Sequence, residues 1–412
     1  MLHRTPEWQN DTAARVQPPS AAALAAHLRA RFDAMSSFTL GAEEELLLVD
    51  PHTLLPTPAV EQALELFEGD PRVTAEFRAS QLEIVSPVSV SVADVARELA
   101  SVRRLAARRL AGRALLVAAG SHPLAVDLGP ITERPRYERI AAEYPWAARR
   151  MLTCGLHVHV AVGGSERALA VHNALRGYLP EIAALAANSP FHEGEDSGLA
   201  TVRTKLNECL PRAGIPPVFP SWEAFADFIV WQRRAGTAPD ASFHWWDLRL
   251  HARLGTLEVR VADAQTRVAD TATVIAFVQS LVALLGARYD AGEPLPVHPA
   301  ERIVDNRWLA TRDGVGGSLA DLETGEPTPT AERLFALVEE LLPTAVELGC
   351  DDELLGVGRL VRDGGGAGRQ RSVAEAHGMD GLVAWLAAES VGPESLEPSR
   401  PAPLHRLIAN TS

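Results

Sequence analysis

Four segments of the sequence predict an α+β protein built around an antiparallel sheet. Each segment alternates between apolar side chains and paired polar or charged ones, as a strand does when one face is buried. Helical stretches separate these strands without regular alternation, which argues against a parallel doubly wound sheet. The four strands are TLGAEEELLLVD (39–50), SQLEIVS (80–86), CGLHVHVAV (154–162) and GTLEVRVAD (255–263).

The composition fits one large domain, or two to three smaller ones, in a reducing compartment. The chain has 412 residues, of which 47% are hydrophobic and 22% charged, and its net charge is −14. That charge argues against broad binding to nucleic acid or anionic membranes. Three cysteines without metal-type spacing fit free thiols, and the first 20 residues lack the apolar segment of a signal peptide. We therefore expect a cytoplasmic protein.

Turn residues and helical periodicity define the elements of the first half of the chain. The helix over 91–112 has Asp94 near its start and Gly112 at its end. The next helical stretch breaks near Pro145, and a short buried strand before it ends in a loop at His122. In chain order we expect a loose segment at 1–20, a helix at 21–35, the first strand at 38–50, the second at 80–86, helix 91–112, the buried strand within 113–123, helix 136–151 and the strand at 154–162.

The second half is predicted to be mainly helical. Its most apolar stretch, 270–290, is interrupted by Gln279 and Ser280, so we expect a buried helix too short to cross a bilayer. The other expected elements are a long helix at 165–189, a functional loop at 189–204, a helix at 221–236, a strand hairpin at 244–263, and a helical C-terminal third interrupted at 321–330 and by the glycine-rich RDGGGAGRQR at 362–371.

Alternation places one set of polar side chains on a common face of the sheet. Glu44 points to the opposite, apolar side, where we expect it to pair with an arginine. The polar pairs are Glu43 with Glu45, Gln81 with Glu83, His157 with His159, and Glu258 with Arg260. The apolar face consists of Leu46, Leu48, Leu82, Ile84, Leu156, Val158, Val160, Leu257, Val259 and Val261.

The chemistry of the polar face favours a hard cation held together with phosphates. Carboxylate-rich ligand sets suit Mg²⁺, and the fork of Arg260 matches phosphate oxygens. A His-x-His pair such as His157 and His159 can also bind Zn²⁺, but no third nitrogen or sulfur ligand is evident beyond His122. The GGGAGRQR segment resembles a flexible phosphate-binding loop, although it lacks the Walker A pattern and a plain flexible loop is the simpler interpretation.

Eight ordered motifs together resemble the glutamate–cysteine ligase type 2 family of carboxylate–amine ligases. The similarity extends from about residue 38 to about residue 392. The motifs are GAEEELLLVD, SQLEIVSPV, GSHP, CGLHVHVAV, ANSPFHEGEDSGLATVRT, LGTLEVRVADAQTR, DNRWLATRDG and GAGRQR.

This resemblance implies a glutamine-synthetase-like catalytic fold, in which a curved, mostly antiparallel sheet forms a funnel flanked by helices. It implies binding of ATP and Mg²⁺ and conversion of a substrate carboxylate, usually that of glutamate, to an acyl phosphate. Cysteine or another amine then attacks to form an amide. The expected organisation is an N-terminal extension (1–37), a catalytic domain (38–392) and a C-terminal tail (393–412), with a homodimer suggested by the family.

The resemblance also implies roles for individual residues. The expected metal ligands are Glu43, Glu45, Glu83, His157 and Glu258. The expected catalytic or substrate contacts are Arg260, Glu83 and, as a weaker candidate, Arg203. The expected ATP contacts are Arg369, Arg371 and His159.

Three alternatives remain open from the sequence alone. The same scaffold could support a kinase that phosphorylates a small molecule and needs no amine. A non-catalytic protein that binds nucleotide or metal is the third interpretation, and a Zn²⁺ hydrolase ranks below these.

Overall fold

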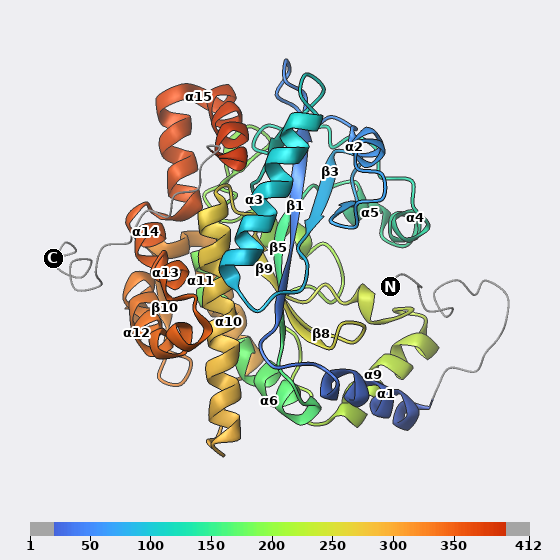
Figure 1. Cartoon of the computed structure of the whole chain (residues 1–412), viewed down its shortest axis with the longest axis vertical. Coiled ribbons are helices and arrows are strands. Elements are labelled where there is room, and N and C mark those ends of the chain that lie inside the picture. Colours follow the sequence, from blue (N-terminus) through green and yellow to red (C-terminus); the bar gives the residue numbers. More distant parts are fainter. Residues whose placement is uncertain (1–19, 393–412) are drawn as a thin grey trace.

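A computed structural model describes residues 20–392 and contains one antiparallel sheet of seven strands flanked by helices (Figure 1). The strand order is β2-β3-β1-β5-β9-β8, and β4 pairs with the end of β1 beyond β5. The strands are β1 (Leu40–Val49), β2 (Val73–Ala75), β3 (Gln81–Val85), β4 (Leu115–Val117), β5 (Gly155–Ala161), β8 (Leu248–His251) and β9 (Thr256–Asp263).

The predicted alternation of the four strands is confirmed. All ten residues assigned to the apolar face are buried and belong to one continuous hydrophobic core. The predicted hairpin is also present, because β8 pairs with β9 in antiparallel register. The α+β class with an open, mostly antiparallel sheet is therefore as expected.

Helices cover the apolar face of the sheet and both of its ends. The N-terminal helices are α1 (Ala21–Asp33), α2 (Val60–Leu66), α3 (Val92–Arg109), α4 (Pro135–Glu143) and α5 (Pro145–Ala148). The middle helices are α6 (Ser165–Leu175), α7 (Leu179–Leu185), α8 (Arg203–Asn207), α9 (Trp222–Ala235) and α10 (Val268–Asp290). The C-terminal helices are α11 (Ala300–Asp313), α12 (Thr330–Leu348), α13 (Asp351–Leu354), α14 (Val357–Arg362) and α15 (Gly365–Val391). Two small hairpins complete the fold, β6 (Phe191–His192) with β7 (Glu195–Asp196) and β10 (Ser318–Ala320) with β11 (Pro327–Pro329).

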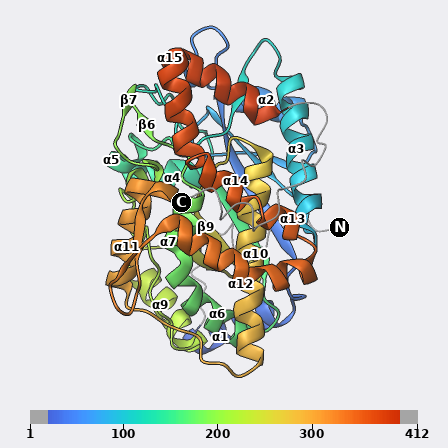
Figure 2. The ribbon, with the colours of Figure 1, turned by 90° about the vertical axis from the view of Figure 1, so that its left-hand side faces the viewer.

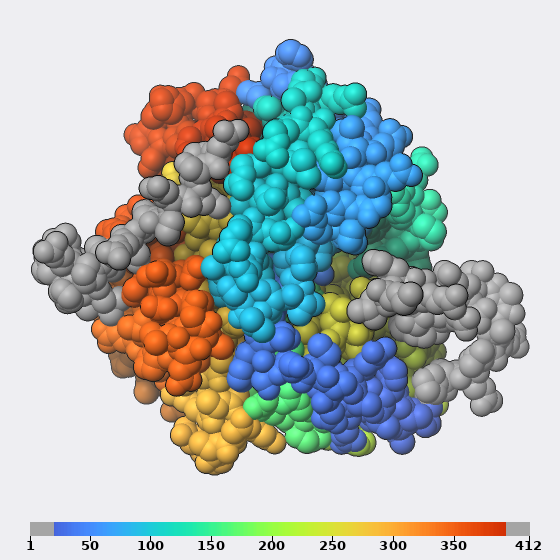
Figure 3. All heavy atoms as spheres, in the orientation of Figure 1, coloured from blue at the N-terminus to red at the C-terminus, as the bar shows by residue number. Residues whose placement is uncertain are grey.

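The apolar helix α10 lies in the core, as predicted. It packs against α3, α6, α12 and α13, and the C-terminal helices lie over it (Figure 2). At 23 residues it is longer than expected and has the length and hydropathy of a membrane span, but 83% of its most apolar window is buried inside the protein. On the face seen in Figure 3, α3 runs between these C-terminal helices and the β2–β3 region.

Two predicted segments differ from the structure. The helix expected over 165–189 is divided into α6 and α7 by a 3₁₀ turn at Arg176–Tyr178, just before Pro180. The glycine-rich segment at 362–371 is not a flexible loop, because α15 begins at Gly365 directly after Gly364, which has a positive φ of 70°. A Cβ on Gly366 would lie 2.2 Å from Asn188 Oδ1, so small residues are required here by close packing.

The expected partner of Glu44 is Arg103 of α3. Both side chains are fully buried, and Arg103 donates from Nε and Nη2 to the two carboxylate oxygens at 2.8 and 2.6 Å. Thr271 of α10 donates to the same carboxylate at 2.7 Å. This charge on the apolar side therefore joins β1 to two covering helices.

The helix α1, within the predicted N-terminal extension, packs on the main core. It contacts α6 and α9, and its residues Ala25, Leu28 and Phe32 are buried. The predicted C-terminal tail, 393–412, and residues 1–19 lie outside the described residues.

Candidate active site

Neighbouring strands bring the predicted carboxylates and imidazoles together on the polar face. Antiparallel pairing places Glu43 opposite His157, Glu45 opposite Glu83, and His159 opposite Glu258. Three overlapping groups have one ligand atom from each residue within 4.8 Å of the others: Glu43 with Glu83 and His157; Glu43 with His159 and Glu258; and Glu45 with Glu76 and Glu83.

The two histidines direct their Nε2 atoms at carboxylate oxygens without forming hydrogen bonds. Nε2 of His157 lies 3.6 Å from Glu45, and Nε2 of His159 lies 3.4 Å from Glu43 and 3.9 Å from Glu258. Both Nε2 atoms are buried and have no hydrogen-bond partner among residues 20–392. The other ring nitrogens are oriented by neighbours, since Nδ1 of His159 lies 3.0 Å from the hydroxyl of Thr256. Buried nitrogens of this kind fit metal ligands whose second nitrogen fixes the ring.

Nearby positive charge does not offset the burial of Glu45 and Glu83. Burial, together with the charge of Glu76, raises the pKa of Glu45 to about 7. Burial and the neighbouring Glu43 raise the pKa of Glu83 well above its usual range. Burial, assisted by the charge of Arg260, lowers the pKa of His157 to about 4, so this imidazole is neutral at pH 7. Such a set would be stabilised by a divalent cation.

Glu258 is paired with two arginines. Its carboxylate is fully buried and accepts from Nε and Nη2 of Arg249 at 2.5 and 2.9 Å, and also from Nη1 of Arg260. Burial would raise the pKa of Glu258, but the two guanidinium groups hold it well below its usual range. Arg260 remains partly exposed, so it is the more movable of the two partners.

Two residues of the cluster were missed in the sequence. Glu76 follows the short strand β2 and lies close to Glu45 and Glu83. Thr74 of β2 is paired with Glu83, so alternation along the chain could have placed Glu76 on the same face as Thr74. Arg249 lies directly opposite Glu258 in the β8–β9 hairpin. The hairpin was predicted, but its register, which makes this pair, was not.

Arg203 lies beside the cluster with its donors directed at the backbone. Its side chain is buried, and Nη2 and Nη1 donate to the carbonyls of Arg260 and Val261 at 3.0 and 3.2 Å. Gly155 is its other neighbour, and the N–H of Gly155 donates to Glu45 at 2.6 Å. The predicted substrate contact for Arg203 remains a prediction.

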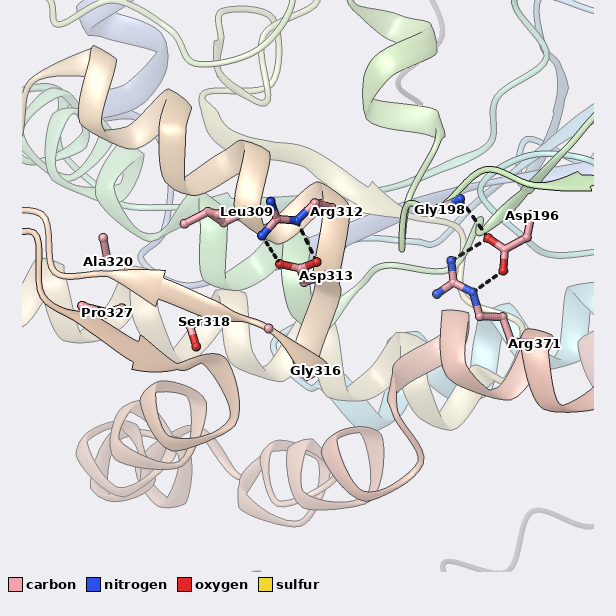
Figure 4. Close-up of a pocket in the computed structure, with 11 residues that line it drawn as sticks. Asp196, Gly198, Leu309, Arg312, Asp313, Gly316, Ser318, Ala320, Pro327 and Arg371 are labelled. Carbon is pink, nitrogen blue, oxygen red and sulfur yellow. Dashed lines mark hydrogen bonds and ion pairs between the residues drawn. The ribbon is translucent and has the colours of Figure 1, made fainter.

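Arg369 and Arg371 have no contact with the carboxylate cluster among the contacts of residues 20–392. Arg369 pairs with the buried Asp270 of α10 at 2.5 Å. Arg371 pairs with Asp196 at 2.7 and 2.8 Å and lines a cavity of about 790 Å³ (Figure 4). A second arginine at this cavity, Arg312, is likewise paired with an aspartate, so its lining offers no unpaired guanidinium. The predicted contact of Arg369 and Arg371 with ATP remains a prediction.

Residues 39–387 match the family model described as glutamate–cysteine ligase family 2. A protein named "Putative glutamate–cysteine ligase 2-3" from Rubrobacter xylanophilus is 43% identical over 368 residues, covering 87% of this chain and 99% of the relative. A similarly named protein from Thermobifida fusca is 34% identical, covering 84% of this chain and 89% of the relative.

Solved structures share the fold at low sequence identity. The glutamate–cysteine ligase of Francisella tularensis, in complex with AMP, aligns with a TM-score of 0.64 at 13% identity, covering 92% of this chain and 96% of that one. A bifunctional glutathione synthetase from Pasteurella multocida aligns with a TM-score of 0.60 at 15% identity, over 90% of this chain and 54% of that one. The glutamine-synthetase-like fold is thus confirmed, and with the match over most of its length this chain belongs to glutamate–cysteine ligase family 2.

Proposed function

We propose that the protein is an ATP- and Mg²⁺-dependent ligase that joins a carboxylate to an amine through an acyl phosphate. Glutamate is the proposed carboxylate, and cysteine or another small amine is the proposed partner. Family membership supports the reaction class. The observation that supports the site is the set of three overlapping ligand groups containing two buried, unpartnered imidazole nitrogens.

Glu43, Glu45, Glu83, His157 and Glu258 would hold the metal ions, with His159 directed at the same oxygens. Bound Mg²⁺ would supply charge neutralisation for the phosphates. Glu76 joins this proposed set from the structure alone. Neutral His157 needs no deprotonation before binding, whereas the raised pKa values of Glu45 and Glu83 mean that metal binding would be coupled to loss of protons from these carboxyl groups.

Arg260 is the proposed contact to the transferring phosphoryl group. A carboxylate oxygen of the substrate attacks the γ-phosphorus and ADP leaves; the amine then attacks the acyl carbon, phosphate leaves, and the amine nitrogen gives up one proton to the released phosphate or to solvent. Charge moves onto the phosphoryl oxygens during the first step, where a guanidinium fork stabilises it. In the structure Nη1 of Arg260 is paired with Glu258, so this role would require Arg260 to release that carboxylate.

We also propose that the protein acts on small molecules in the cytoplasm. Its long apolar helix α10 is buried in the protein core, which is consistent with this location. A homodimer and the domain limits at residues 38 and 392 remain proposals from the family.

The test is a reaction containing Mg²⁺-ATP, glutamate and a panel of amines including cysteine, with ADP and products followed by mass spectrometry. ADP and a new amide that require both partners would establish the ligase. Glu43→Ala and Glu258→Ala should abolish ADP release, whereas Glu181→Gln should retain it, because Glu181 of α7 pairs with Arg333 of α12 outside the site.

Other outcomes would contradict the proposal. A phosphorylated product formed without any amine would indicate a kinase. Tight ATP binding with no ADP in any mixture would indicate a non-catalytic protein. Activity retained in both glutamate variants would overturn the site.

A further inference from the structure

Asp263, the last residue of β9, is a buried carboxylate at which several of the sequence motifs meet. Only 1% of its surface is exposed. It accepts hydrogen bonds from the N–H of Asn188 at 2.8 Å, from the hydroxyl of Ser189 at 2.7 Å and from the hydroxyl of Thr201 at 2.9 Å. The GSHP motif also approaches closely, since a Cβ on Gly120 would lie 2.4 Å from the carboxylate carbon.

These bonds hold both ends of the loop at 189–203. Ser189 and Thr201 form a backbone bridge, and the N–H of Arg203 lies 3.4 Å from the Ser189 hydroxyl. Asp263 therefore fixes the point from which the Arg203 side chain emerges. Nη1 of Arg203 lies 3.8 Å from Asp263, so the carboxylate also compensates its charge.

The Arg203 side chain reaches an irregularity in β9. The register of β5 with β9 changes between Leu156 and Val158, which face Ala262 and Val259, so β9 contains one extra residue there. Arg203 donates to the carbonyls of Arg260 and Val261, which lie within this bulge. A bulge re-aims the side chains around it. The bonds from Arg203 thus fix the backbone that directs Arg260.

We infer that Arg203, held by Asp263, is a positioning residue that fixes the β9 bulge and so aims Arg260 at the site. Its Nη1 and Nη2 atoms donate to the backbone carbonyls of β9. The inference deepens the proposed function and rests on it for the role of Arg260. The glycine-rich motif supports Asn188, whose N–H donates to Asp263. Gln370 of α15 donates to the backbone oxygen and to Oδ1 of Asn188 at 2.7 and 2.9 Å.

A double-mutant cycle between Arg203→Met and Arg260→Met tests this inference. The first readout is the Mn²⁺ dissociation constant without nucleotide, which requires no turnover. Arg260 competes with a cation for Glu258. If Arg203 acts by aiming Arg260, Arg203→Met changes the Mn²⁺ dissociation constant in the wild type, and this effect disappears in the Arg260→Met background. We expect the effect of Arg203→Met on the dissociation constant to differ at least threefold between the two backgrounds.

The second readout is kcat and KM for the ligase reaction in the same four proteins. Arg203→Met should lower kcat about 10- to 100-fold with little change in the KM of the carboxylate, and the double variant should match Arg260→Met alone. If Arg203 instead contacted the substrate directly, Arg203→Met would raise KM, and the activity losses of the two single variants would multiply in the double variant. General structural damage would also lower activity further in the Arg260→Met background.

Asp263→Asn keeps the test available if Arg203→Met does not fold. It retains the shape of the side chain, and its effect should likewise disappear in the Arg260→Met background. Glu181→Gln is the matched control, a buried acid paired with an arginine outside the site, and should leave Mn²⁺ affinity unchanged.

Failure of the proposed function and failure of the positioning role would give different results. Coupling in the Mn²⁺ cycle without any turnover would reject the proposed function and support the positioning role. Turnover with additive effects in both cycles would reject the positioning role and leave the ligase assignment standing.

Discussion

Replacing Arg260 by methionine should tighten the binding of a divalent cation while it slows catalysis. In the structure Arg260 and Arg249 both donate to Oε1 of the buried Glu258, so a cation approaching this oxygen must displace a guanidinium N–H. Arg260 is the partner that can leave, since 20% of its side chain is exposed against 11% for Arg249.

The size of the effect follows from the interaction that is removed. A hydrogen bond to a charged group contributes about 1.5–3 kcal/mol, which corresponds to roughly a 10- to 100-fold change in a binding constant. Methionine removes this competition and keeps the apolar stem. Loss of a guanidinium that stabilises developing charge should at the same time lower kcat about 10²- to 10³-fold.

The assay is a titration of the nucleotide-free protein with Mn²⁺, followed by calorimetry or by the electron paramagnetic resonance of the free ion. Arg333→Met is the matched control, because Arg333 also pairs with a buried glutamate but lies outside the site. Mn²⁺ affinity that is unchanged or weaker in Arg260→Met, with the control unaffected, would refute the competition between Arg260 and the cation.

Three further predictions concern pH, stability and packing. Because burial raises the pKa of Glu45 to about 7 and a cation binds the ionised form, Mn²⁺ affinity should fall up to about tenfold per unit as pH decreases below 7; constant affinity between pH 5.5 and 7 would contradict this. Arg103→Met leaves Glu44 buried without its ion pair and should lower the free energy of unfolding by about 3–5 kcal/mol in urea denaturation; a loss below about 1 kcal/mol would show that the pair is not needed. Gly155→Ala places a Cβ 2.3 Å from Nη2 of Arg203 and should lower kcat about tenfold or more, whereas Gly316→Ala, with open space around it, should not; equal activities would indicate that this contact relaxes freely.

The polar face of the sheet could be predicted because a strand has a period of two. Glu43, Glu45, His157, His159 and Glu258 needed only local alternation to be placed on one side, and the structure brings them together. The opposite orientation of Glu44 followed from the same argument. Its partner Arg103, 59 positions away in the sequence, could be expected only as some arginine.

The residues that were missed depend on pairing between distant segments. Arg249 joins Glu258 through the register of a hairpin, and Asp263 gains its partners only when the loop at 189–203 folds against the end of β9. The bulge in β9 has no signal in the alternation of LEVRVAD.

The glycine-rich segment was wrongly predicted to be a loop for a related reason. Its glycines allow α15 to begin against Asn188, and no local pattern distinguishes that packing from flexibility. The ATP contacts expected of Arg369 and Arg371 came from the family resemblance and remain a prediction; in the structure both side chains pair with aspartates.

The most direct test of the central claim is transfer of ¹⁸O from the substrate carboxylate. The protein is incubated with Mg²⁺-ATP, the amine identified by the product screen, and glutamate labelled with ¹⁸O in its side-chain carboxylate. We expect one ¹⁸O atom in the released phosphate for each amide formed, because an acyl phosphate transfers that oxygen. Amide formation with unlabelled phosphate would contradict activation of the carboxylate by phosphorylation.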